Sequence, residues 1–195
     1  MDNEAKRKAL QTAYRQMIKP YSKNLQFAVT LTLKTSATIK IKRFANYGNE
    51  YFSYSKCLTE ELLDGTVRRF TKLLTATLYG NQSKHKNKQA WAMPLVIACI
   101  EGRKGGKRTH LHLAIGNVPA TKCDNFNILV AQTWARCDFA HKSACIKSIS
   151  DAEGWLTYIT KEVGYTDNDA LDVVASTIPP FIQQSICTES RLQTA

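Results

Sequence analysis

The sequence predicts an α+β fold, in which one mostly antiparallel sheet is flanked by helices. Four segments read as strands: 26–34 and 108–116, which alternate apolar and polar side chains, and 95–101 and 143–149. Three segments repeat apolar residues with helical spacing: 59–78, 119–136 and 152–164. Strand pairs that alternate with helices favour a sheet with helices packed against it.

The sequence patterns of the remaining elements are weaker. Residues 4–18 form an amphipathic pattern that Pro20 ends, and residues 37–56 indicate one or two further strands. Residues 84–88 read as a solvated basic loop. We expect a single domain over 1–195, with a core of about 25–165, an N-terminal helix within 1–20 and a C-terminal extension over 166–195.

Composition favours a polyanionic partner. The chain carries 27 basic and 16 acidic residues, a net charge of +11, although a merely well-solvated basic protein is the alternative. No stretch is long and apolar enough to span a bilayer, and the N-terminus leads into no signal core. The six cysteines form no Cys-x-x-Cys pair, as in a reducing compartment. We therefore expect a cytoplasmic protein of the host cell, with no membrane partner.

Two histidines interrupt the apolar pattern of the segment 108–116. Leu111, Leu113 and Ile115 would point to one face of a strand. His110 and His112 would then share the opposite face. A pair of solvent-facing or hydrogen-bonded histidines is the plain alternative.

The upstream strand adds a carboxylate to this pair. A tight Gly105–Gly106 turn would place Lys104 opposite Lys107. Counting back along both strands, Glu101 then opposes His110 and Cys99 opposes His112. Directly opposed residues share a face, with Cβ atoms about 5 Å apart. Two imidazoles and a carboxylate suit Mn²⁺, Zn²⁺ or Fe²⁺, and Mg²⁺ where water and phosphate complete the shell.

These motifs resemble the HUH endonuclease superfamily, and specifically its single-tyrosine replication initiators (Rep type). The residues that match the family's motifs are His110-Leu-His112, the acidic residue nine positions before it, and Tyr158-Ile-Thr-Lys161 downstream. The strand-like segment 27–33, with its threonines, resembles the upstream family motif. The three motifs occur in the family's order.

The resemblance implies a sheet akin to that of RNA-recognition motifs, and a DNA-nicking activity. Glu101, His110 and His112 would hold Mg²⁺ or Mn²⁺, and Tyr158 would attack the scissile phosphate to give a 5′-phosphotyrosine. Lys161 would favour the phenolate or hold the phosphate, because free tyrosine ionises only near pH 10. The product would start rolling-circle replication of a plasmid, virus or similar element.

The expected partner is single-stranded DNA at an origin or hairpin. Thr30, Thr32 and Lys34 would lie on the histidine face, where small and hydroxyl side chains leave room for a ligand. Basic residues of the hairpin tip would contact the phosphate backbone: Arg103, Lys104, Lys107 and Arg108. The sequence contains no phosphate-binding P-loop, so unwinding would depend on a separate helicase or on supercoiling.

Several alternatives stay open. Tyr165 competes with Tyr158 as nucleophile, and Cys99 could complete a zinc site, although a small buried hydrophobe is its commoner role. A single-tyrosine HUH transposase shares the chemistry, but those enzymes typically carry glutamine where Lys161 stands. The third alternative is a non-catalytic nucleic-acid-binding domain with the same sheet. Such a domain would not need Glu101, His110, His112, Tyr158 and Lys161 together.

Overall fold

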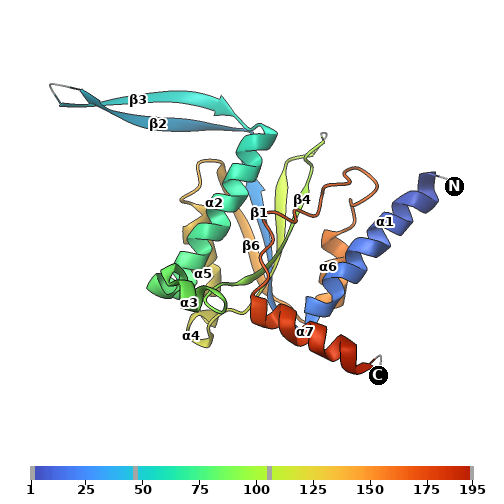
Figure 1. Cartoon of the computed structure of the whole chain (residues 1–195). Coiled ribbons are helices and arrows are strands. Elements are labelled where there is room, and N and C mark those ends of the chain that lie inside the picture. The colour runs from blue at the N-terminus through green and yellow to red at the C-terminus, as the bar shows by residue number, and fades with distance from the viewer. Residues whose placement is uncertain (1–2, 46–47, 105–106, 194–195) are drawn as a thin grey trace.

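The computed structural model describes residues 3–45, 48–104 and 107–193. Its centre is a four-stranded antiparallel sheet with the order β4-β5-β1-β6 (Figure 1). The strands are β1 (Leu25–Leu33), β4 (Leu95–Glu101), β5 (His110–Gly116) and β6 (Ala140–Ser148). The predicted α+β class and the antiparallel sheet are confirmed.

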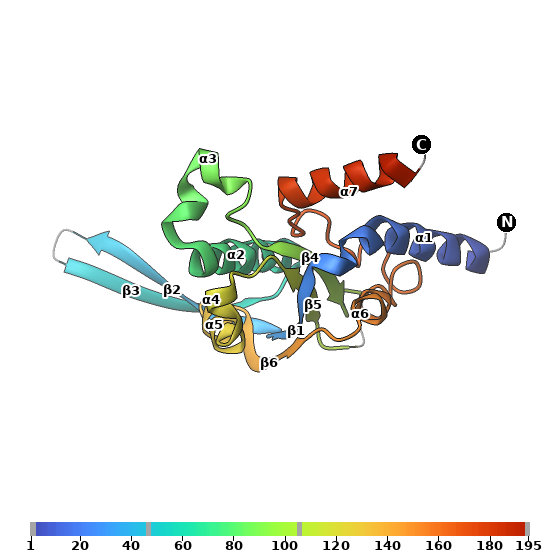
Figure 2. The same cartoon turned by 90° about the horizontal axis from the view of Figure 1, so that it is seen from below.

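Helices cover both faces of this sheet (Figures 1 and 2). One face packs against α2 (Glu60–Tyr79) and α5 (Phe126–Trp134), which bury Phe70 and Trp134 with Val29, Leu111 and Leu113 of the sheet. The other face packs against α1 (Asn3–Ile18), α6 (Ala152–Ile159) and α7 (Pro180–Gln193). The shorter helical segments are η1 (Lys19–Asn24), η2 (Gly80–Lys84), α3 (Lys86–Gln89) and α4 (Ala120–Cys123).

Three predicted segments differ in detail. The expected helix over 119–136 is divided into α4 and α5 at Asp124 and Asn125, two poor helix formers. The expected helix over 152–164 ends at Ile159, and Gly164 then takes a positive φ of 79°. A side chain at Gly164 would meet the backbone of Arg7 at 2.8 Å, so this turn lets α1 approach closely. The basic loop 84–88 includes the short helix α3.

The central hairpin has the predicted register but a longer loop. Glu101 pairs with His110 and Cys99 with His112, and strand pairing stops there, so Lys104 and Lys107 do not belong to the ladder. Gly105 and Gly106 lie outside the described residues. The register survives because residues 102–109 are centred on that glycine pair.

The segment after residue 165 is better integrated than a loose extension would be. It runs along the outer edge of β4, where Val96 bridges Thr177 and Cys99 bridges Leu171. Leu171 and Ala175 are buried. This contact covers backbone groups that an edge strand would otherwise expose.

A second hairpin extends away from the sheet. Strands β2 (Ser36–Ala45) and β3 (Gly48–Cys57) pair with each other along their whole length and form a separate two-stranded ribbon (Figure 1). We call Ser36–Cys57 the arm. In the described part of the chain, no helix is both long and apolar enough to cross a membrane.

Candidate active site

The register of β4 and β5 brings the predicted metal ligands to one end of the sheet. Glu101 Oε2 lies 2.8 Å from His112 Nε2, and the rings of His110 and His112 stack with centroids 6.3 Å apart. Only 5% of the His112 side chain and 13% of the Glu101 side chain are exposed. Polar groups this buried need hydrogen-bond partners, and the Glu101 carboxylate and the His112 imidazole partner each other.

Thr30 fixes the other side of the His112 ring. Its Oγ1 lies 3.0 Å from His112 Nδ1, because Thr30 on β1 pairs directly with His112 on β5. Thr32 pairs with His110 in the same way and is buried. The threonine hydroxyl can donate to Nδ1 or accept from it, so it supports either tautomer of the imidazole.

Lys161 completes a three-way contact on Glu101. Its Nζ lies 2.8 Å from Glu101 Oε2, the oxygen that also meets His112. The same ammonium lies 3.9 Å from the centroid of the Tyr158 ring. Lys161 belongs to the turn after α6 rather than to the helix itself, but that turn still places it beside Tyr158.

Tyr158 faces the site from α6. Asp151 caps this helix through the Gly154 N–H, and Leu156 and Ile159 bury the opposite side, so Tyr158 stays 45% exposed. Its ring meets that of His112 edge-on at 5.4 Å between centroids. The sequence prediction that Tyr158 points away from the core is confirmed.

Trp155 is a member of the site that the sequence analysis missed. Its ring stacks on Tyr158 at 5.3 Å and 19°, and its indole N–H donates to the Leu113 carbonyl at 3.2 Å. It therefore anchors Tyr158 to β5. A tryptophan three residues before the tyrosine, one helical turn away, was the available signal.

The charges of the site hold defined protonation states. Burial alone would raise the pKa of Glu101, but hydrogen bonds from Lys161 and His112 lower it to about 2. Burial lowers the pKa of His112, with Glu101 opposing the shift, so the imidazole is neutral at pH 7. Desolvation opposes, but Glu101 and Tyr158 outweigh it and raise the pKa of Lys161, which stays an ammonium.

Glu101, His110 and His112 are donors of the types that a divalent cation binds. Neutral His112, with Nδ1 held by Thr30, presents Nε2 toward the ionised Glu101, and His110 stacks alongside. A ligating histidine with its second nitrogen hydrogen-bonded is the usual arrangement in metal sites. Across the described residues, no three His, Cys, Asp or Glu side chains already converge on one point. Lys161 holds Glu101 Oε2 at present, so the carboxylate would be shared with the cation.

Cys99 lies in the core. It pairs in register with His112, but it is 1% exposed and packs among Leu95, Ile97 and Leu171. Burial raises its pKa, which opposes the thiolate that zinc needs.

The basic residues of the β4–β5 loop are divided between ion pairs and solvent. Arg103 is largely buried between Asp64 and Asp167, and Lys104 also pairs with Asp167. Lys107 joins Glu101, at 3.5 Å, to Glu162, at 3.4 Å. Glu162 was not predicted; it is buried and also accepts from the Gly102 N–H. By contrast, Arg108 and Lys34 are exposed and pair with no acidic side chain among the described residues.

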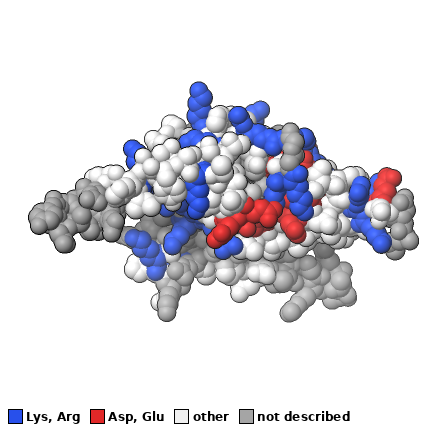
Figure 3. All heavy atoms as spheres, turned by 90° about the horizontal axis from the view of Figure 1, so that it is seen from above, with Lys and Arg blue, Asp and Glu red and all other residues white. Residues whose placement is uncertain are grey.

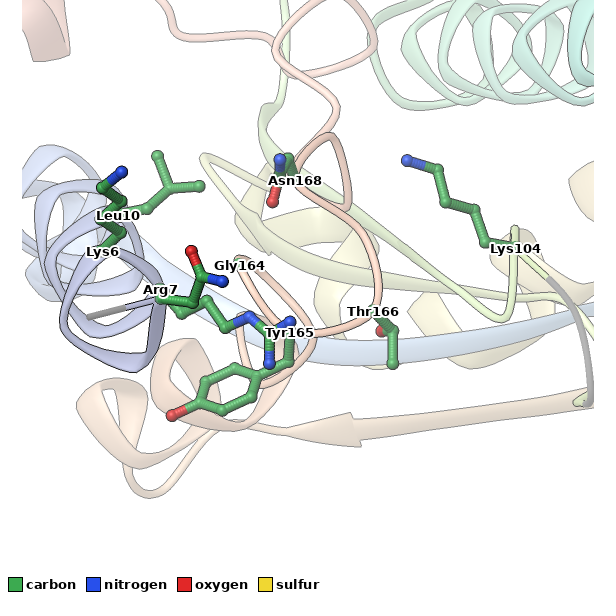
Figure 4. Close-up of a pocket in the computed structure, with 9 residues that line it drawn as sticks. Lys6, Arg7, Leu10, Lys104, Gly164, Tyr165, Thr166 and Asn168 are labelled. Atoms are coloured by element: carbon green, nitrogen blue, oxygen red, sulfur yellow. The ribbon is translucent and has the colours of Figure 1, made fainter. Parts of the chain in front are cut away.

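Two cavities border the tyrosines. One of about 340 Å³ lies beside Tyr158 and Trp155, with Ala28 and Lys147 on its sheet side. The other, of about 450 Å³, contains Tyr165 with Lys6 and Arg7 of α1, and Lys104 across the opening (Figure 4). Tyr165 thus lies in a basic hollow of its own, and of these two tyrosines it is Tyr158 that contacts His112.

No family model, curated protein or solved structure matches this chain.

Proposed function

We propose that the protein is a site-specific nickase and strand-transferase of single-stranded DNA, of the HUH replication-initiator type. One observation carries the proposal: the exposed phenol of Tyr158 lies against His112, which pairs with Glu101, while Lys161 contacts both Glu101 and the tyrosine ring. A structural tyrosine does not need a histidine, a carboxylate and a lysine at one point.

In this proposal Tyr158 is the nucleophile. Its phenolic oxygen attacks the scissile phosphorus, a Tyr–O–P bond forms, and the bond from phosphorus to the 3′ oxygen breaks. The phenolic proton is balanced by the proton that the departing 3′-hydroxyl gains. The phosphodiester energy is kept in the new bond, so a 3′-hydroxyl can later reverse the step and reseal a strand.

The other residues neutralise charge and hold geometry. A divalent cation, Mg²⁺ or Mn²⁺, bound by Glu101, His110 and His112 would polarise a phosphate oxygen. Lys161 is protonated at pH 7, so its role is to stabilise negative charge at the phenol or the phosphate and not to accept the proton. Trp155 holds the Tyr158 ring in place by stacking.

The test uses labelled single-stranded oligonucleotides that carry candidate origin sequence, with Mn²⁺ or with EDTA. A denaturing gel and intact mass would detect a covalent adduct. We expect an adduct that needs the metal, persists in Tyr165→Phe and is lost in Tyr158→Phe. An adduct that persists in Tyr158→Phe and is lost in Tyr165→Phe would identify Tyr165 as the nucleophile instead. Tight binding without an adduct on any cognate origin would favour the non-catalytic binding domain.

The transposase alternative shares this adduct. Lys161 favours a replication initiator, because single-tyrosine transposases typically carry glutamine there. The strands that are joined in the ligation product distinguish the two enzymes. An initiator reseals its own strand, whereas a transposase joins element ends to a new target.

A further inference from the structure

The arm is the largest feature that the proposed chemistry leaves unused. Its two ten-residue strands pair only with each other within the described part of the chain, and the ribbon stands clear of the helices (Figures 1 and 2). Ala37 is buried and Ile39 packs on the main core, so the root is fixed to the body. A free two-stranded hairpin is marginally stable in water, so its length needs a reason.

The described outer part of the arm exposes large apolar side chains. Tyr51 is 71% exposed, Phe52 51% and Tyr54 45%, and Ile41 is 46% exposed opposite Phe52. Phe52, Tyr54 and Ile41 share one face of the ribbon, while Tyr51 lies on the other. Apolar side chains gathered on a solvated surface mark a contact site.

The charge of the arm favours a polyanion over a second copy of this chain. Between Ser36 and Cys57 the sequence has four basic residues and one acidic residue, and Lys40 and Lys56 are exposed. Two such arms would repel each other, as would two chains of net charge +11. Acidic side chains gather near the middle of the upper face and not along the described arm (Figure 3).

The root of the arm lies at the active-site end of the sheet. Thr32 pairs with His110, β1 ends one residue later at Leu33, and β2 starts at Ser36. Lys34, in the connection, is exposed. A DNA strand that leaves the histidines along β1 would therefore meet the arm first.

We propose that the arm binds the single-stranded DNA that flanks the nick, with Tyr51, Phe52 and Tyr54 stacking on unpaired bases and Lys40 and Lys56 contacting phosphates. Aromatic side chains interleaved with lysines are the combination that unpaired nucleic acid binds. The choice of DNA rests on the proposed function.

The test compares Tyr51→Ser/Phe52→Ser with Trp91→Ser, a similarly exposed aromatic outside the arm. Binding is measured by fluorescence anisotropy on two oligonucleotides, one that just spans the nick and one extended on both sides. We expect the arm variant to bind the extended strand at least about ten-fold more weakly, and the control to bind as the wild type does. Adduct formation on the short strand at saturation should be unchanged. In Lys40→Gln/Lys56→Gln, the slope of log affinity against log salt should fall by about 0.7 per lysine.

Three results would overturn the proposal: unchanged affinity of the arm variant for the extended strand, a loss that is larger for duplex DNA, or a dimer that dissociates in the arm variant with no effect on DNA. Arm-dependent binding by a wild type that forms no adduct would support the arm and reject the nickase. The two proposals therefore fail separately.

Discussion

The two faces of the sheet are built from neighbouring residues of the same strands, yet they do different things. Toward α2 and α5, Val29, Leu111 and Leu113 are fully buried in apolar contacts. Toward α1 and α6, the apolar layer stops around Cys99 and Ala114, and Thr30, His112 and Glu101 follow it toward the end of the strands. We call the α2/α5 side the closed face and the α1/α6 side the open face. The closed face is expected to supply most of the stability, and the charged groups of the open face a smaller share.

The largest test of this division is Phe70→Ala. Phe70 of α2 is fully buried and packs edge-on against Trp134 with ring centroids 5.5 Å apart. We expect the free energy of unfolding to fall by about 3–5 kcal/mol, from lost burial plus a cavity. Denaturant unfolding would measure it, with Phe70→Leu as a milder control. A loss under about 1 kcal/mol would show that the closed face is not the source of stability.

The second test is Glu101→Gln on the open face. The substitution keeps the shape but removes the charge that holds Lys161 and His112. We expect a stability loss of about 1.5–3 kcal/mol, because hydrogen bonds to a charged group are lost, together with loss of the metal-dependent adduct. Glu153→Gln, in an exposed pair with Lys19, is the matched control and should cost under about 1 kcal/mol. Equal losses in both variants would contradict a special role for Glu101.

The same carboxylate gives a pH dependence with a defined sign. The pKa of Glu101 is about 2 in the folded protein against an ordinary 4.5, so its contribution is complete above pH 4.5 and is lost as pH falls toward 2. The lowered pKa of His112 adds a loss that begins as pH falls below 6.5. The raised pKa of Lys161 acts in the opposite direction, because its contribution is complete below pH 10.5 and is lost above it.

Unfolding free energies of wild type and Glu101→Gln, measured against pH, isolate the contribution of the Glu101 carboxylate. We expect the two curves to converge on the acid side of pH 4.5. Curves that stay parallel through that range would mean that Glu101 does not carry the shift.

The sequence predicted which residues meet at the site better than which contacts connect them. Glu101 and His110 could be paired by counting, because alternation fixes the face and the loop is centred on Gly105–Gly106. Lys161 was expected on a helix; the helix ends earlier, yet the following turn keeps it beside Tyr158.

Other parts had no sequence signal. The packing of residues 166–178 along β4 uses backbone bridges, which leave no periodicity in side chains. Arg103 looked like a free DNA contact, but buried Asp167 lies far from it in sequence and holds it. The hydrogen bond between Thr30 and His112 depends on a side-chain rotamer, which composition does not encode.

Among the site residues, the smallest expected stability effect belongs to Thr30→Val, which separates folding from function on the open face. Valine keeps the shape and removes one hydrogen bond to a neutral imidazole, so we expect a loss of about 1 kcal/mol. Affinity for Mn²⁺ should fall about ten-fold or more, because Nδ1 loses the group that orients the ring while Nε2 binds the cation. Thr30→Ser restores a hydroxyl and should recover most of the affinity. Isothermal titration with Mn²⁺ and denaturant unfolding read the two effects apart. If Thr30→Val binds Mn²⁺ as tightly as the wild type, then Thr30 only packs beside His112. The open face would then differ from the closed one in polarity, but its hydrogen bonds would not serve metal binding.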